Sequence, residues 1–157
     1  MGKLLGAALL AAGLAASALA QDVIGARSFV AQIYIKATNN RHFGFASLKL
    51  LTPDLYDLVQ RGTQGGKTGG LDFDPICQCK DNDGLSAQIL SVTGTESKAV
   101  AQVLLRFDAD RIVPPKRLTF VLTRAPLAGW KIADIQTARV PSLRAWLMRR
   151  SGRGRRD

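Results

Sequence analysis

The chain has few of the residues that build metal and redox centres: 157 residues include only two cysteines, two methionines and one histidine. Cys77 and Cys79 alone fall short of a zinc site, and His42, the one histidine, is distant from them in sequence. A framework of several disulfides is also excluded, because these two cysteines can pair only with each other or with a second molecule. We therefore expect no metal and no cofactor.

Long apolar runs are scarce as well. Beyond residue 20, no segment reaches the roughly 20 apolar residues needed to cross a bilayer. The first residues differ: Met1-Gly2-Lys3 is a positive start, residues 4–19 carry no charge, and Ala18-Leu19-Ala20 is a small-x-small cleavage pattern. This combination predicts a signal peptide over residues 1–20 and a periplasmic or secreted protein after cleavage near Ala20. Gln21 is not a cysteine, so we expect no lipid-modified N-terminus.

Acidic residues are outnumbered, with 12 Asp and Glu against 22 Lys and Arg, which gives a net charge of +10. Much of this excess lies at the C-terminal end. Residues 149–157, "RRSGRGRRD", carry no apolar side chain, and we expect them to form a disordered basic tail. Export argues against nucleic acid as a partner. We expect at most a weak contact with an anionic surface, through five arginines: Arg149, Arg150, Arg153, Arg155 and Arg156.

The middle of the chain changes period from helix to strand. Apolar residues between Ala26 and Ala37 recur at helical spacing, and Thr52-Pro53-Asp54 is typical of a second helix start, with Gly62 as its stop. Period-two alternation then predicts strands over 85–93, 99–107, 118–123 and 130–133. Pro141 and Ser142 introduce a short helix that carries Leu143, Trp146 and Leu147 on one side.

This order predicts a single α+β domain over residues 21–148. We expect a long N-terminal helix and a second helix packed on a curved antiparallel sheet of about four strands, followed by a short C-terminal helix. Residues 62–70, "GTQGGKTGG", match the letters of a phosphate-binding loop, but a helix precedes them and "GGLDFDP" follows where a helix should start. They are interpreted as a flexible connector.

The "TPDLYDLV" helix, the "LDFDPICQCKD" loop and the "GWKIADIQ" strand resemble a family of small exported bacterial proteins, the domain-of-unknown-function 3828 family. That family belongs to the nuclear transport factor two and cystatin-like superfamily, so the resemblance implies a cystatin-like cone. It covers roughly residues 25–147 and implies an acidic Asp-Pro loop between the helices and the sheet. Lys80 before Asp81 departs from the Gln-Asp often found there. The family has no established activity.

Residues 71–84, "LDFDPICQCKDNDG", hold four of the twelve acidic residues and both cysteines. The simplest interpretation is structural, because Asp side chains at turns bond neighbouring backbone N–H groups. A Cys77–Cys79 disulfide is compatible with this, and export favours oxidation. However, Cα atoms two residues apart often exceed the preferred separation of about 5.5–6 Å. Such a bridge would be easily reduced and would stiffen the loop more than it stabilises the fold.

Two further interpretations of this loop are weaker. The calcium-loop pattern fails, because Cys79 stands where an oxygen ligand belongs and Leu90 replaces the expected glutamate. Catalysis would need His42 to pair with Asp134, Asp72 or Asp74, and spacing alone reveals neither hydrogen-bond reach nor a tuned pKa.

We therefore expect a soluble, exported binding protein whose partner is an unknown protein or small ligand of the cell envelope. The alternative is a small-molecule enzyme that uses a His/Asp pair in a cone-fold pocket. Phe107, Phe120 and Trp130 are candidates for lining a recognition surface, although such aromatics can also simply fill the core, and for Trp130 we favour the core. The candidate binding or loop-ordering residues are Asp72, Asp74, Cys77, Cys79, Asp81, Trp130 and Asp134, and none is assigned as catalytic.

Overall fold

The computed structural model describes residues 12–39, 50–64, 71, 73–80, 82–108 and 114–153. Three helices and four strands follow one another in the predicted order: α1 (Ala12–Asn39), α2 (Pro53–Gln64), β1 (Leu85–Gly94), β2 (Lys98–Phe107), β3 (Lys116–Ala125), β4 (Gly129–Thr137) and α3 (Leu143–Arg153). Neighbouring strands pair antiparallel in the order β1-β2-β3-β4. The α+β class and the four-stranded antiparallel sheet are therefore confirmed.

Within the described residues, no helix is long and apolar enough to cross a membrane.

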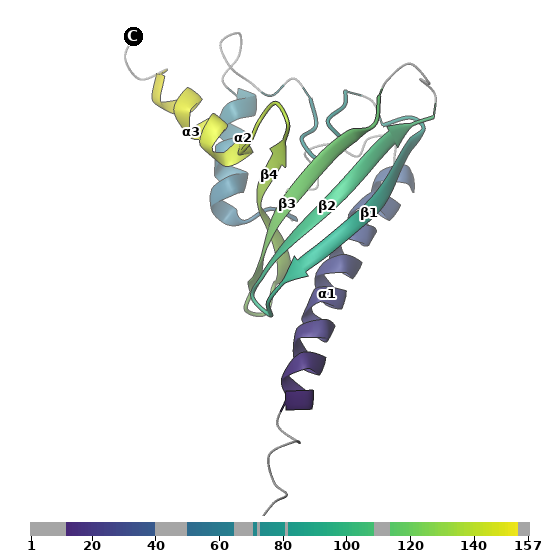
Figure 1. Ribbon diagram of the computed structural model, residues 1–157. Coiled ribbons are helices and arrows are strands. Elements are labelled where there is room, and N and C mark those ends of the chain that lie inside the picture. The colour runs from purple at the N-terminus through teal and green to yellow at the C-terminus, as the bar shows by residue number, and fades with distance from the viewer. Residues whose placement is uncertain are drawn as a thin grey trace, which may run out of the picture.

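One face of the sheet is buried, and α1 packs on it along β1, with further contacts to β2 and β4 (Figure 1). The alternation that predicted the strands places one side of each strand in this core. The central part consists of Ala99, Ala101, Val103, Leu105, Leu118, Phe120, Leu122, Ile132 and Ile135. From α1 come Ala26, Val30, Ile33 and Tyr34, which belong to the predicted stripe. Fully burying a large apolar side chain contributes about 1.5–3 kcal/mol, so this layer dominates the stability of the fold.

The helix α1 begins earlier than the stripe that predicted it. It starts at Ala12, and an alanine-rich segment precedes the buried residues. Alanine has the highest helix propensity, which favours a helix over this segment. Every buried α1 residue that the structure describes lies after residue 25.

A β-bulge in β4 changes which side chains face the core. The register shifts where Val121 and Leu122 of β3 pair with Asp134 and Ile132 of β4. Strict alternation from Ile132 would have buried Asp134, whereas the bulge buries Ile135 and leaves Asp134 half-buried. A bulge adds one residue to one strand and so reverses the facing of the residues that follow.

The half-buried Asp134 of β4 accepts a backbone hydrogen bond from the start of helix α3. Its Oδ1 accepts hydrogen bonds from the backbone N–H of Ile135 and of Arg144, each at 2.9 Å. Ser142 Oγ accepts a third from the N–H of Ala145 at 3.0 Å. The bonds to Arg144 and Ala145 satisfy N–H groups in the first turn of α3, which have no partner inside the helix.

The helix α2 packs against α3 and contacts β4. The carbonyl of Thr52 accepts the N–H of Tyr56, as expected for the residue before the helix. The buried Thr52 hydroxyl has no partner of hydrogen-bonding geometry. It nevertheless lies close enough to Asp54 to lower the pKa of that carboxyl, ahead of the Arg144 guanidinium that forms an ion pair with it.

The prediction that Gly62 ends α2 is wrong. The helix continues to Gln64, and Gly62 lies where α3 comes close. A Cβ atom at this position would lie 2.8 Å from Cδ2 of Leu147, so the absence of a side chain permits the close packing of the two helices. Residues 65–70, the rest of the predicted connector, lie outside the described residues.

The prediction of a disordered tail over residues 149–157 is wrong at its start. Helix α3 runs to Arg153, and the guanidinium of Arg150 lies 4.2 Å from the ring centroid of Trp146. An arginine stacked on an aromatic face is held by a cation–π contact. Arg149 and Arg150 therefore belong to the helix, and Arg155 and Arg156 lie outside the described residues.

Both outer strands of the sheet have neighbours. Leu51 forms a parallel bridge with Ile132 of β4, and the N–H of Thr52 donates to the Ile132 carbonyl at 2.9 Å. On the other side, Arg27 of α1 donates to the carbonyl of Ile89 in β1 at 3.5 Å. A register shift between Ile89 and Ser91 interrupts β1 near the same point.

Candidate functional site

The candidate site is the turn formed by residues 73–80, which precedes β1 and lies near the start of β3. Its backbone is closed by two hydrogen bonds: the N–H of Asp74 donates to the Cys79 carbonyl at 2.8 Å, and the N–H of Gln78 donates to the Asp74 carbonyl at 2.7 Å. Pro75, which follows Asp74, fixes its own φ and suits the tight turn. The turn is therefore closed by backbone hydrogen bonds that need no side chain.

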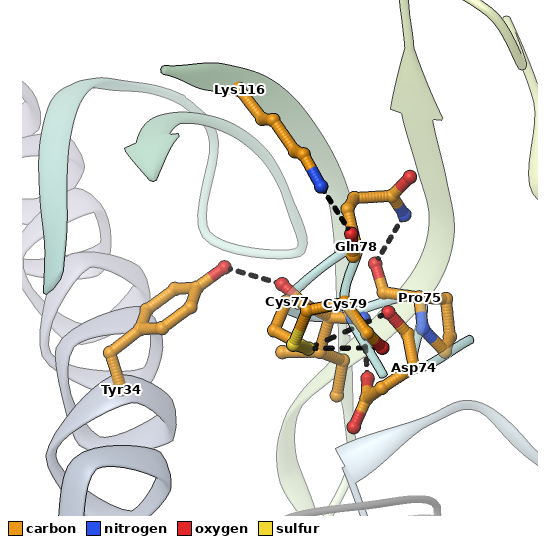
Figure 2. Close-up of a disulfide and its surroundings, with 8 residues drawn as sticks. Tyr34, Asp74, Pro75, Cys77, Gln78, Cys79 and Lys116 are labelled. Carbon is orange, nitrogen blue, oxygen red and sulfur yellow. Dashed lines mark hydrogen bonds between the residues drawn. A yellow bond between two sulfur atoms is a disulfide. The ribbon is translucent and has the colours of Figure 1, made fainter. Parts of the chain in front are cut away.

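Cys77 and Cys79 are joined in a disulfide (Figure 2). Their Cα atoms are 5.2 Å apart, within the range a disulfide requires. The residue between them makes this possible, because Gln78 adopts a left-handed backbone with φ of 55°. That conformation costs a residue with a side chain about 1–2 kcal/mol. The Gln78 side chain offsets part of this by donating to the Pro75 carbonyl at 2.8 Å.

Two side chains from distant elements hold the turn in place. The buried Tyr34 of α1 donates its hydroxyl to the Ile76 carbonyl at 3.0 Å. Lys116, at the start of β3, donates to the Gln78 carbonyl at 2.6 Å, and its ammonium lies 5.3 Å from the centroid of the Phe107 ring. Figure 2 shows the two side chains reaching the turn from different sides. The turn is therefore fixed to both the helix and the sheet.

The carboxyl group of Asp74 lies in the interior of the turn. Its Oδ1 accepts the N–H of Ile76 at 2.7 Å, whereas its buried Oδ2 has no hydrogen-bond partner. Burial raises the pKa of Asp74, against the opposing effect of the Ile76 and Cys77 N–H groups. Burial also raises the pKa of Tyr34 well above 10, and the negative charge of Asp74 raises it further. Tyr34 therefore stays a neutral hydrogen-bond donor.

Replacing Asp74 with asparagine should change how stability depends on pH. The folded-state pKa of Asp74 lies above its ordinary value of 3.8. The stability it contributes is therefore fully present below pH 3.8 and is lost as the pH rises through the folded-state pKa. Asparagine keeps the Oδ1 acceptor and does not ionise, so the stability of Asp74→Asn relative to the wild type should increase as the pH rises. Urea unfolding at a series of pH values between 3 and 7 measures this difference.

Asp57→Asn, on the exposed side of α2, is the matched control for removing a carboxylate away from the turn, and an equally steep trend there would show that the effect does not come from the turn. If the stability of Asp74→Asn relative to the wild type stays constant or falls as the pH rises, ionisation of the Asp74 carboxyl does not destabilise the folded protein.

The other predicted site residues lie apart from this turn or outside the described residues. Asp72, Asp81 and His42 belong to the latter group, so a His/Asp pair cannot be placed. Asp134 bonds the backbone at the start of α3. Trp130 is 8% exposed and belongs to the core.

The aromatic recognition surface that the sequence suggested does not form. Phe120 is fully buried, and Phe107 is partly buried beneath Lys116. An open hollow of about 520 Å³ lies between the hairpin turns of β1–β2 and β3–β4. It is lined by residues such as Glu96, Arg124 and Leu127, at the end of the sheet opposite Lys116. In the part of the chain that the structure describes, no group of three or more His, Cys, Asp or Glu side chains could hold a metal.

Sequence reasoning missed three residues of the site: Tyr34, Gln78 and Lys116. Tyr34 belongs to the apolar stripe predicted for the first helix, and its hydroxyl also has a partner 42 residues away in the chain. A tyrosine in an otherwise apolar stripe is a usable signal, because a buried hydroxyl usually finds an acceptor. Neither Lys116 nor Gln78 gives such a signal.

The chain matches no family model, no curated protein and no solved structure.

Proposed function

We propose that the protein is an exported binding protein whose recognition element is the turn at residues 73–80. The observation that supports this is the contrast between its fixed backbone and its accessible surface. The backbone hydrogen bonds of the turn, together with Tyr34 and Lys116, hold it in place, while Gln78 and Cys79 are partly exposed and Lys80 is exposed. A loop held in one conformation before binding loses less entropy when a partner docks.

A periplasmic or secreted location completes the proposal. All described buried residues of α1 follow the predicted cleavage point near Ala20, so cleavage there removes none of them. A disulfide also persists more readily in an oxidising compartment. The resemblance to the exported family, together with α1 packed on the sheet, supports a cystatin-like cone as the architecture.

Intact-mass measurement of the protein purified from its native envelope tests the location. We expect a chain that begins at Gln21 and lacks two hydrogens relative to the dithiol form. A full-length chain found only in the cytoplasm would contradict export without bearing on what the turn binds.

Photo-crosslinking in intact cells tests the recognition element. A crosslinking side chain at position 80, beside the turn, should give a discrete adduct. The matched control carries the same side chain at position 98, where Lys98 is likewise exposed but lies at the opposite end of the sheet. Identical adducts from both positions, or none from position 80, would contradict the proposal.

A further inference from the structure

We infer that Cys77 and Cys79 form a redox-active pair that exchanges its disulfide with dithiols of other proteins or peptides, with Cys79 as the sulfur attacked first. This activity goes beyond the binding role proposed above. It rests on four features of the turn: the redundancy of the disulfide as a clasp, the unequal exposure of the cysteines, the fit of the dithiol form, and the cation at the turn.

The disulfide contributes little to holding the chain together. It links residues only two apart, and so short a loop removes little entropy from the unfolded chain. The same turn is already closed by the hydrogen bonds of Asp74 with Cys79 and of Gln78 with Asp74. A bond that the fold does not require can open and close without unfolding the domain.

The two cysteines are unequally accessible. Cys77 is 1% exposed and belongs to the core, whereas Cys79 is partly exposed. Thiol–disulfide exchange begins when a thiolate attacks one sulfur, and access decides which sulfur that is. Because the Cys79 sulfur is accessible and the Cys77 sulfur is buried, an incoming thiolate attacks Cys79 first.

The turn also accommodates the dithiol. Sγ of Cys77 lies 3.8 Å from the Asp74 carbonyl oxygen and 3.7 Å from the Cys79 carbonyl oxygen. A disulfide sulfur has no proton to donate, so these contacts become hydrogen bonds only when Cys77 is a thiol. The buried thiol therefore finds acceptors already in position.

A positive charge lies at the residue between the two cysteines. The ammonium of Lys116 is held against the Gln78 carbonyl at 2.6 Å. Cations close to a cysteine favour its thiolate, so Lys116 attracts the incoming thiolate and stabilises negative charge on the departing sulfur. Lys116 acts here as a positioning residue.

The exchange needs no reactant other than the partner dithiol and the Cys77–Cys79 disulfide. A partner thiolate attacks Sγ of Cys79, a mixed disulfide forms, and Cys77 leaves as a thiolate that takes up a proton. The second thiol of the partner loses its proton and attacks the partner's own sulfur in the mixed disulfide. Cys79 then leaves as a thiolate and is protonated. The partner dithiol is oxidised by two electrons, and the Cys77–Cys79 pair is reduced by two.

The test uses the oxidised full-length protein and an excess of a reduced dithiol peptide, with no other reductant. The reaction is quenched by alkylation and followed by intact mass. We expect the peptide disulfide to form in step with two alkylated cysteines on the protein, and the reverse reaction when the reduced protein meets the oxidised peptide. A protein that keeps its disulfide throughout would overturn the inference.

Single-cysteine variants test the order of attack. With an oxidised peptide as probe, Cys77→Ser should form a mixed disulfide through Cys79. Cys79→Ser should do so through Cys77 at least about tenfold more slowly, because access to the sulfur limits exchange. Equal rates would overturn the assignment of Cys79. If a variant fails to fold, alkylation of the reduced wild type, with each site located by fragmentation, gives the same comparison.

The role of Lys116 is tested by Lys116→Gln, with Lys98→Gln at the far end of the sheet as the control. Lys116→Gln should slow the reaction of the reduced protein with the oxidised peptide. It should also raise the pH at which the rate of that reaction reaches half its maximum. The control should change neither the rate nor this pH. An unchanged pH profile in Lys116→Gln would remove Lys116 from the mechanism.

Discussion

Replacing Phe120 with alanine should lower the free energy of unfolding by about 3–5 kcal/mol, the range for removing a buried aromatic ring. Phe120 on β3 is fully buried, and its ring centroid lies 6.3 Å from that of Tyr34 on α1. The substitution opens a cavity between the sheet and the helix that the surrounding side chains fill only in part. Denaturant unfolding followed by circular dichroism measures the loss.

Val100→Ala is the control for Phe120, because Val100 lies on the neighbouring strand β2 and is 39% exposed. It should change the free energy of unfolding by no more than about 0.5 kcal/mol. Were Phe120→Ala equally mild, Phe120 would be available for the recognition surface that the sequence suggested, and the core described here would be wrong.

Gly94→Ala should lower the free energy of unfolding by about 3 kcal/mol, at the upper end of the usual range for overpacking. Gly94 ends β1 with φ of +154° and pairs with Ala99 of β2. A Cβ atom there would overlap the Lys98 carbonyl oxygen and lie 2.6 Å from Cα of Ala99. These are backbone atoms of a paired strand, so neither can move aside without breaking the hairpin.

The control for Gly94 is Gly129→Ala in the other outer hairpin. Gly129 also has a positive φ, of +71°, but a Cβ atom there meets nothing within 4 Å. Only the backbone conformation is then unfavourable, which costs about 1 kcal/mol. Thermal unfolding of both variants separates the two effects, and equal losses would show that close approach at Gly94 is not the cause.

The strands and helices were predictable because their burial follows a regular period. The predicted strand over 99–107 agrees with β2 to within one residue, since every second residue there faces the core. The same rule fails in β4, where it would bury Asp134. An extra residue in one strand is not visible in a pattern of apolar residues, and only the pairing with Val121 and Leu122 reveals the bulge.

The position of the candidate site in the sequence was predictable, but the arrangement of its side chains in space was not. The density of Asp and Cys residues identified the turn, and Asp before Pro indicated its local bonds. Whether Cys77 and Cys79 could pair depended on a left-handed Gln78, a conformation that glycine and asparagine normally mark. Tyr34 and Lys116 reach the turn through tertiary packing of segments that lie far apart in sequence.

The contacts at the two outer strands of the sheet affect how readily the protein aggregates at high concentration. Exposed strand edges are templates on which a second chain can add its own strand, which is how fibrils grow. The Leu51–Thr52 segment occupies part of the β4 edge, and Arg27, together with the interrupted register near Ser91, makes β1 a poor template. At high concentration the folded chain should therefore resist growth into intermolecular β-sheet fibres.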